Sequence, residues 1–210
     1  TKALIDSINV AYDERESRGF VRLNLIAVGL TLALIVFVLV ALALVAVVPL
    51  VLGWIGLGEG MAWALSLLRW PLLLLFLMGA LAVLYRYAPD RDEPRWRWVS
   101  PGAAGASVLF VVGSIGFSLY VSYSDSYDAT YGSLGAIAVT MVWLFVAAYS
   151  VLLGAQLNAE TERQTVRDST EGRPEPLGRR GARAADTVGP TSEEGAGKEV
   201  GKGASRRRPD

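Results

Sequence analysis

Four long apolar runs dominate the first three-quarters of the chain, and short polar segments separate them. The runs cover about residues 23–48, 70–87, 102–123 and 132–157. A bilayer core about 30 Å thick needs roughly 20 apolar residues in helical form. No segment shows the sustained period-two alternation of a membrane β-strand. The pattern predicts an all-α fold: a polytopic transmembrane helix bundle with four spans in this chain and a disordered C-terminal tail.

Prolines define the expected ends of the helices. Pro49 is expected to end the first span, because proline cannot continue a regular helix. Pro71 and Pro101 fit the first turns of the second and third spans, where a missing N–H is harmless. The intervening stretch 53–68 has two interpretations: an outer loop with an interfacial piece, or an early extension of the second helix.

Lys and Arg alternate between the two sides of the predicted spans. They cluster before the first span, between the second and third, and after the fourth, whereas Arg69 stands alone between the first and second. Because basic loops stay in the cytoplasm, we expect a bacterial inner-membrane protein with both the N-terminal segment and the C-terminal tail inside. The residues on the inner side are Lys2, Arg15, Arg18, Arg22, Arg86, Arg91, Arg95, Arg97, Arg163, Arg167, Arg173, Arg179 and Arg180.

The two ends of the chain differ from the central bundle, residues 21–160. Residues 1–20 carry an apolar helical stripe that includes Leu4, Ile8 and Tyr12. It predicts an amphipathic helix that lies on the inner membrane surface or packs on the bundle. The segment 161–210 has no aromatic residue, one leucine and many charges. Its apolar surface is too small to offset the entropy of ordering, which predicts a disordered cytoplasmic tail.

Composition narrows the possible chemistry. The chain has 210 residues, a formal net charge of zero, and neither cysteine nor histidine. Disulfides are therefore impossible, and the usual ligands of zinc and iron are missing. We expect no catalytic residue, no cofactor, no metal site and no nucleic-acid partner. The expected partners are the lipid bilayer and, as an open possibility, further copies of the same chain.

Candidate functional residues form two groups. Polar residues near the inner mouth of the bundle are candidates by default, although ordinary polar termination of a helix is the favoured explanation. They are Asn24, Gln156, Asn158 and Glu160. Small residues let helices approach closely, either for packing or to form a substrate passage or hinge. They are Ala103, Ser107, Gly113 and Gly116 on the third span, and Gly132, Gly135 and Ala136 at the start of the fourth.

Six short segments, in order and spacing, resemble one family. They are AYDERESRGF (11–20), LLRWPL (67–72), LYRYAPDR (84–91), WVSPGA (98–103), YGSLGA (131–136) and LLGAQLNAE (152–160). Together they are similar to the YihY/virulence factor BrkB inner-membrane proteins, formerly labelled ribonuclease BN. The resemblance covers roughly residues 4–160. It implies a six-helix bundle in the full-length protein, of which this chain would be the C-terminal two-thirds, with Thr1 an internal position.

The resemblance also bears on function. Members of the family are described as candidate transporters or envelope factors, and their ribonuclease label is regarded as a misassignment. We therefore expect a transport or export component of the cell envelope. A non-transporting scaffold for envelope integrity is the alternative, and a ribonuclease is the third hypothesis. The position of Gln156 is commonly Glu in the family pattern, so a carboxylate that acts there elsewhere is absent here.

Overall fold

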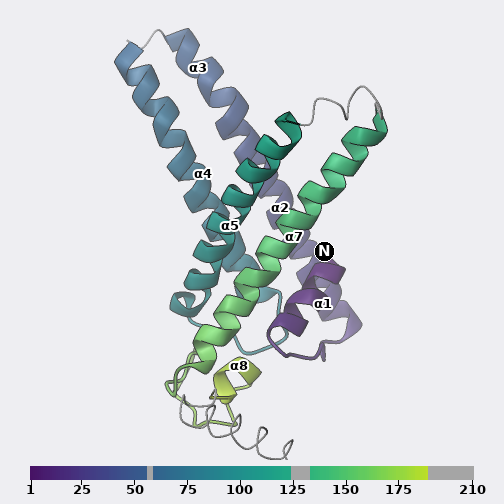
Figure 1. The fold of residues 1–210 in the computed structure, drawn as a ribbon. Helices are drawn as coiled ribbons and strands as arrows, with labels where there is room; N and C mark the ends of the chain where they lie inside the picture. The colour runs from purple at the N-terminus through teal and green to yellow at the C-terminus, as the bar shows by residue number, and fades with distance from the viewer. Residues whose placement is uncertain (56–58, 124–132, 189–210) are drawn as a thin grey trace, which may run out of the picture.

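The computed structural model describes residues 1–55, 59–123 and 133–188. Within these ranges it has no strand, and four helical stretches are long and apolar enough to cross a membrane. The predicted all-α bundle with four spans is confirmed. The elements are α1 (Lys2–Ala11), α2 (Phe20–Leu42), the π-helical turn η1 (Ala43–Val47), α3 (Val48–Ile55), α4 (Glu59–Tyr87), α5 (Trp96–Ser122), α7 (Ser133–Arg163) and α8 (Arg183–Asp186) (Figure 1).

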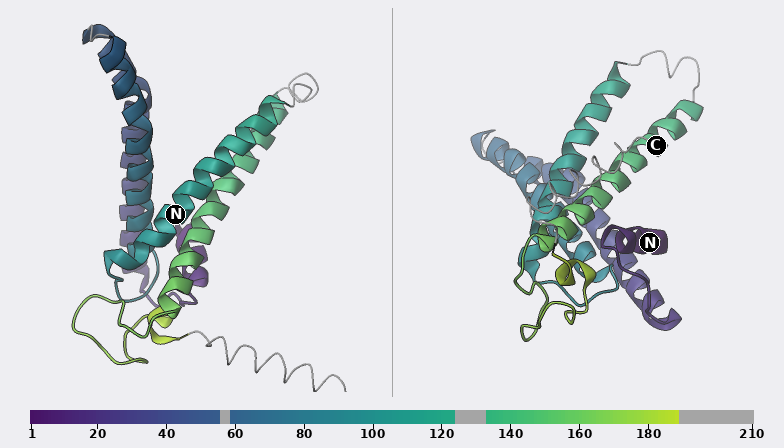
Figure 2. Two further views of the ribbon diagram at one scale, coloured as in Figure 1. Left: turned by 60° about the vertical axis from the view of Figure 1, so that its left-hand side comes forward. Right: turned by 60° about the horizontal axis from the view of Figure 1, so that its bottom comes forward.

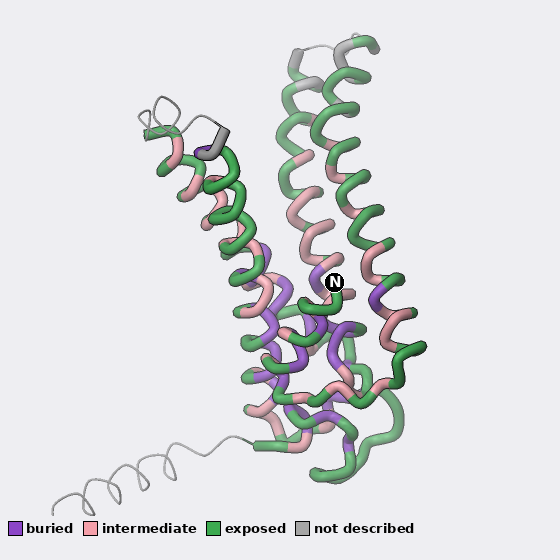
Figure 3. The backbone as a smooth tube through the Cα atoms, turned by 90° about the vertical axis from the view of Figure 1, so that its right-hand side faces the viewer, coloured by how far each residue is buried: buried purple, intermediate pink, exposed green. Residues whose placement is uncertain are grey.

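The spans form two arms of a V. One arm contains α2, η1, α3 and α4, and the other contains α5 and α7 (Figure 2). The arms converge at the end of the molecule that holds residues 1–19, 88–95 and 164–188, which we call the base. Buried residues are concentrated in the base and in the turns of the arms next to it, whereas the distal parts of the arms are largely exposed (Figure 3). Exposed apolar helices, with their backbone hydrogen bonds satisfied internally, are the form that lipid tolerates.

Pro71 and Pro101 lie inside their helices and do not begin them. Both predictions are wrong because the helices start earlier, α4 at Glu59 and α5 at Trp96. The stretch 53–68 is correspondingly helical wherever the structure describes it. From Glu59 on it is the early extension of the second helix that the alternative interpretation expected.

The predicted end of the first span at Pro49 is also wrong, because the helix continues to Ile55. The π-helical turn η1 ends two residues before this proline, at Val47. Pro49 has no N–H, so the carbonyl of Val45, four residues earlier, loses its ordinary α-helical partner. Arg69 Nη1 of α4 donates a hydrogen bond to that carbonyl at 3.3 Å. A side chain from the neighbouring helix thus replaces the missing donor.

Helices α5 and α7 approach closely where Gly102 faces Gly154. A Cβ atom on Gly154 would lie 2.6 Å from the carbonyl oxygen of Gly102, so only glycine fits. Asn158 fastens this crossing and is only 1% exposed. Its Oδ1 accepts a hydrogen bond from the Gly102 N–H at 2.7 Å, and its Nδ2 donates to the Val99 carbonyl at 3.2 Å. Small residues and one polar clamp therefore hold the second arm together.

α1 packs against α7 at the base. Ile5, Ile8 and Tyr12 are buried, and the helix ends at Ala11. Of the two interpretations of residues 1–20, the structure therefore supports a helix that packs on the bundle. This helix covers Lys2–Ala11 and is shorter than the predicted segment 1–20.

Residues 164–188 are also ordered, because they pack against the rest of the base. The predicted disordered tail therefore does not start at Thr161. Pro94 and Thr170 form an isolated antiparallel bridge. The buried Arg180 donates hydrogen bonds to three backbone carbonyls of this segment. Polar hydrogen bonds, and not a large apolar core, organise the segment, so composition alone does not reveal it. Residues 189–210 of the predicted tail lie outside the described residues.

Replacing Gly102 with alanine should lower the free energy of unfolding by about 1–3 kcal/mol, because the added methyl group overlaps the Gly154 carbonyl. Gly79→Ala in α4 is the matched control, since nothing lies within 4 Å of its Cβ. This control should be neutral or slightly stabilising. Unfolding in mixed micelles, followed by circular dichroism, measures both variants. A Gly102 variant as stable as the wild type would contradict the close crossing.

Candidate functional site

Three of the short sequence segments quoted above meet at the base. They are residues 11–20, the end of α4 with its following loop (84–91), and the last turns of α7 (152–160). Their charged and polar side chains form a buried network in two parts. One part is centred on Arg91 and the other on Arg18.

Arg91 links three elements of the base. It forms two parallel hydrogen bonds of 2.6 Å with Glu162 of α7, and its guanidinium lies 5.0 Å from the centre of the Tyr12 ring. The two charged side chains are 0% and 2% exposed. Burial disfavours the guanidinium charge, but the hydrogen bonds and charge of Glu162 outweigh this, so the pKa of Arg91 lies above its usual range. The pair is a bidentate, charge-assisted contact.

Arg18 organises the second part of the network. It donates to both carboxylate oxygens of Glu16, at 2.7 and 2.6 Å, and to a backbone carbonyl after α4 at 2.8 Å. Asn9 joins the two segments: its Oδ1 accepts the Asp90 N–H at 2.7 Å, and its Nδ2 donates to Glu16 at 3.0 Å. Ser17 donates its N–H and its hydroxyl to Asp90, each at 2.6 Å. Residues 9–18 are thereby fastened to the loop after α4.

These contacts shift the ionisation of several groups. The hydrogen bonds from Arg18 hold the pKa of Glu16 below its usual range. Burial alone would raise the pKa of Asp90, but the hydrogen bonds from Ser17 and the nearby arginines outweigh it and lower the pKa. Burial raises the pKa of Tyr12 above its usual range, so its phenol stays neutral. At neutral pH the carboxylates of Glu16 and Asp90 and the guanidinium groups of Arg18 and Arg91 are therefore charged, and Tyr12 is neutral.

The predicted inner-mouth residues do not come together in one place. Asn24 donates to the Phe20 carbonyl of its own helix, and Asn158 is buried in the α5–α7 crossing. Gln156 and Glu160 share an exposed face of α7, where the amide donates to the carboxylate at 3.2 Å. Only the last two residues are arranged as a pair. The four residues therefore form no single polar vestibule within the described chain.

The small residues are also divided. Ala103 and Ser107 are buried, and a Cβ on Gly113 would lie 2.8 Å from a methyl group of Val146 on α7, so these three positions serve helix packing. Gly116 has open space around it. Of the three positions at the start of the fourth span, Gly135 is buried, Ala136 is exposed and Gly132 lies outside the described residues.

An apolar cavity of about 770 Å³ lies between the N-terminal end of α1, α2 and α4. Two of its aromatic residues, Phe37 and Phe76, stack with ring centres 5.1 Å apart. Its volume is in the range of small-molecule sites. The lining residues are Thr1, Leu4, Leu30, Ala33, Leu34, Val36, Phe37, Leu75, Phe76, Leu77, Gly79, Ala80, Leu81, Val83, Leu84 and Trp96.

Sequence reasoning did not identify these two features. The lining of the cavity has the same residue types as a lipid-facing surface, so no pattern separates them. The arginines of the base were interpreted as markers of orientation, and Arg18 also as a possible contact for anionic headgroups. A usable signal existed, because Tyr12, Arg18, Asp90 and Arg91 all fall within the segments that carry the family resemblance.

Breaking the buried ion pair should be costly. Arg91→Met is expected to lower the free energy of unfolding by about 3–5 kcal/mol, because it leaves the Glu162 carboxylate buried and unpaired. The double variant Arg91→Met/Glu162→Met should recover much of this loss. Arg97→Met is the control at an exposed position and should change stability by less than about 0.5 kcal/mol. Chemical unfolding in mixed micelles measures all three, and additive losses in the double variant would contradict the coupling.

The second part of the network should weaken in acid. The folded pKa of Glu16 lies below the unfolded value of about 4.3, so its contribution is fully present above that pH and is lost as the pH falls through the folded pKa. The stability difference between the wild type and Glu16→Gln should therefore shrink between about pH 6 and pH 3. Asp6→Asn, at an exposed position on α1, is the charge-matched control. A constant difference for Glu16→Gln over this range would contradict the assignment.

Known proteins similar to this chain are membrane proteins or members of one family. Residues 1–177 match the family model described as Virulence factor BrkB. The ribonuclease-like protein YfkH of Bacillus subtilis is 34% identical over 161 residues, which cover 75% of this chain and 58% of that protein. A UPF0761 membrane protein of Vibrio parahaemolyticus is 39% identical over 98 residues, covering 46% of this chain and 30% of the relative.

A UPF0761 membrane protein of Tolumonas auensis is 35% identical over 82 residues, covering 39% of this chain and 27% of the relative. The chain thus spans less than two thirds of the length of these relatives. No solved structure matches it.

Proposed function

The chain belongs to the virulence factor BrkB family of integral membrane proteins, and from this premise we propose that it is a transport or export component of the cell envelope. We further propose that it resides in the bacterial inner membrane with the base on the cytoplasmic side. The clustering of basic residues at the base supports this orientation, because positively charged segments stay in the cytoplasm.

The observation that carries the proposal is the apolar cavity between α1, α2 and α4. It contains almost no polar group, so a hydrated ion or a sugar would lose its hydration there without compensation. An apolar molecule, or the apolar part of an amphipathic molecule, fits this surface. We therefore favour a substrate with a substantial hydrocarbon portion. The six-helix bundle of the full-length protein stays a prediction.

The base suits the role of a fixed support during such transport. Arg91 and Glu162 connect the loop after α4 with α7, and Arg18 and Asp90 connect the N-terminal segment with the same loop. The two arms share these anchors and separate farther away (Figure 2). Relative movement of the arms would change access to the cavity and leave the base intact.

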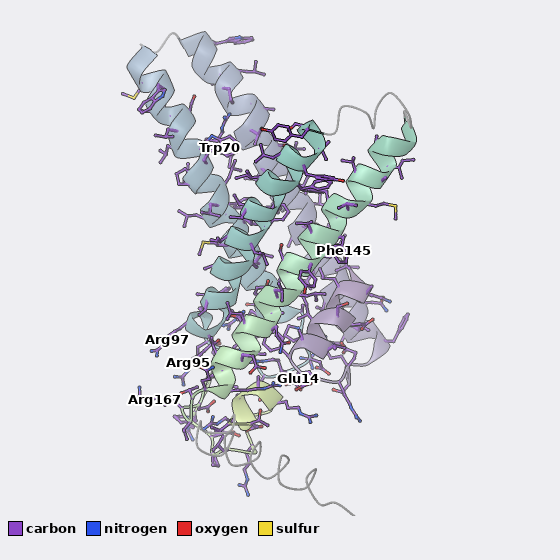
Figure 4. The ribbon with its side chains drawn as sticks, in the orientation of Figure 1. Glu14, Trp70, Arg95, Arg97, Phe145 and Arg167 are labelled. Carbon is purple, nitrogen blue, oxygen red and sulfur yellow. The ribbon has the colours of Figure 1, made fainter. Side chains whose placement is uncertain are left out.

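The scaffold alternative rests on a different observation. Arg95 and Arg167 of the base and Arg97 in the first turn of α5 are exposed along one edge of the molecule (Figure 4). Backbone hydrogen bonds join the segments that carry Arg95 and Arg167. An exposed basic surface of this kind can hold an acidic partner. Ribonuclease activity is not proposed. Asp90, an acid of the base that a metal-dependent nuclease could use, has its carboxylate occupied by Ser17 and Arg18.

Filling the cavity tests the transport proposal. Ala80→Phe places a ring in the cavity and should reduce protein-dependent movement of a fluorescent phospholipid or amphipathic dye in reconstituted vesicles to the level of protein-free vesicles. Ala64→Phe, on an exposed position of α4 outside the cavity, is the matched control and should retain wild-type activity. The proposal fails if the wild type moves nothing from a broad panel of solutes and lipids. Equal inhibition by both substitutions would exclude the cavity as the route.

A further inference from the structure

Arg69 lies inside a membrane-spanning helix, although the sequence pattern placed it in a loop. The second span covers Trp63–Tyr87, and Arg69 follows its first residue by six positions (63 to 69). At 1.5 Å per residue this is about 9 Å along the helix axis. A charged side chain within a span is rare and costly, and it marks a functional site by default.

The protein itself satisfies Arg69 incompletely. Nη1 donates to the Val45 carbonyl at 3.3 Å, a long hydrogen bond, and the guanidinium lies 5.2 Å from the centre of the Trp70 ring. Nε is buried and has no acceptor. Among the residues that the structure describes, no carboxylate pairs with Arg69, and Nη2 has no acceptor either. Nη2 is not among the buried unpaired atoms, so an external ligand can reach it.

The missing partner must be an anion. An unpaired guanidinium in an apolar environment is strongly stabilised by an acceptor that carries negative charge. The end of the guanidinium, Nη1 with Nη2, presents parallel N–H groups that match two phosphate oxygens. Trp70 is 61% exposed and covers one face of the group. An exposed tryptophan beside a cation is typical of the depth at which lipid headgroups lie.

The geometry points to a phosphate-binding site formed by Arg69, Trp70 and the π-helical turn η1, in the leaflet away from the base. Two phosphate oxygens accept from Nη2 and from the second N–H of Nη1, while the first N–H of Nη1 stays on the Val45 carbonyl. Phosphate can reach this place as a phospholipid headgroup or as a soluble anion, and the recognition chemistry is the same. This inference is independent of the transport proposal, because it needs neither the apolar cavity nor a moving substrate.

The wild-type protein provides the first test. Native mass spectrometry of the purified chain in detergent should show saturable binding of phosphatidylglycerol, and no binding of diacylglycerol, which has the same chains but no phosphate. Separate titrations with inorganic phosphate and with glycerol phosphate distinguish the sources. Binding of these soluble anions assigns the site to a free phosphate, whereas binding of the lipid alone assigns it to a headgroup. Equal binding of diacylglycerol and phosphatidylglycerol would overturn the proposal.

Variants provide the second test. Arg69→Gln should weaken phosphatidylglycerol binding at least about tenfold, the size of effect expected for one charge-assisted contact of about 1.4 kcal/mol or more. Arg69→Lys should retain part of the affinity, because lysine keeps the charge but loses the parallel donors and the planar stacking. Arg15→Gln, which removes an exposed arginine of the base outside the basic surface of Arg95, Arg97 and Arg167, is the control and should bind as the wild type does.

One further variant separates binding from folding. Trp70→Leu removes the ring that covers the guanidinium, so it should weaken phosphatidylglycerol binding. It leaves Arg69 and its contact with Val45 in place, so the thermal stability of the lipid-free protein should not fall. Unchanged affinity in both Arg69→Gln and Trp70→Leu would show that the lipid binds elsewhere and would overturn the site.

Discussion

Lipid offers no hydrogen bonds, so the protein itself must repair every break in a membrane-spanning helix. This constraint explains much of the architecture. Pro49 deprives the Val45 carbonyl of its partner, and Arg69 supplies a donor from α4. Asn158 of α7 also bonds to the backbone of a neighbouring helix, because it accepts from the Gly102 N–H and donates to the Val99 carbonyl of α5. In both cases a side chain of one helix bonds to the backbone of the next, and at Pro49 this contact supplies the donor that the proline lacks.

Polar contacts also organise the base, where they order short loops instead of joining membrane-spanning helices. Short segments with few apolar residues fold there because arginines satisfy carboxylates and carbonyls at once. Arg91 does so with Glu162, Arg18 with Glu16, and Arg180 with the backbone of residues 164–188. Each guanidinium is nearly buried, so loss of one partner would leave a desolvated charge. Order at the base therefore depends on complete pairing more than on apolar area.

Features that depend on bulk polarity could be predicted from the sequence. The spans follow from hydropathy, and the apolar stripe that includes Ile8 and Tyr12 is buried, although Tyr12 follows the last residue of α1. Features that depend on a specific partner could not. A proline is compatible with the first turn of a helix and also with the interior of a kinked one. Pro71 and Pro101 lie in helix interiors because the residues before them are helical too. An asparagine near the end of a helix looks the same in the sequence whether it ends that helix or bonds to a neighbouring one. The role of Asn158 becomes visible only in the structure, where Gly102 and Gly154 bring α5 and α7 close together.

The distribution of close contacts along α5 indicates which part of the molecule can change shape. From Gly102 to Gly113 an added methyl group would collide with α7, whereas Gly116, farther from the base, has open space around it. The arm is thus tightly packed near the base and looser beyond it. Because packed interfaces resist continuous deformation whereas loosely contacting helices can shift, movement is expected in the distal parts of the V. Arg69 and η1 lie in that distal region on the other arm, so a phosphate bound there would act on the part of the bundle that is free to move.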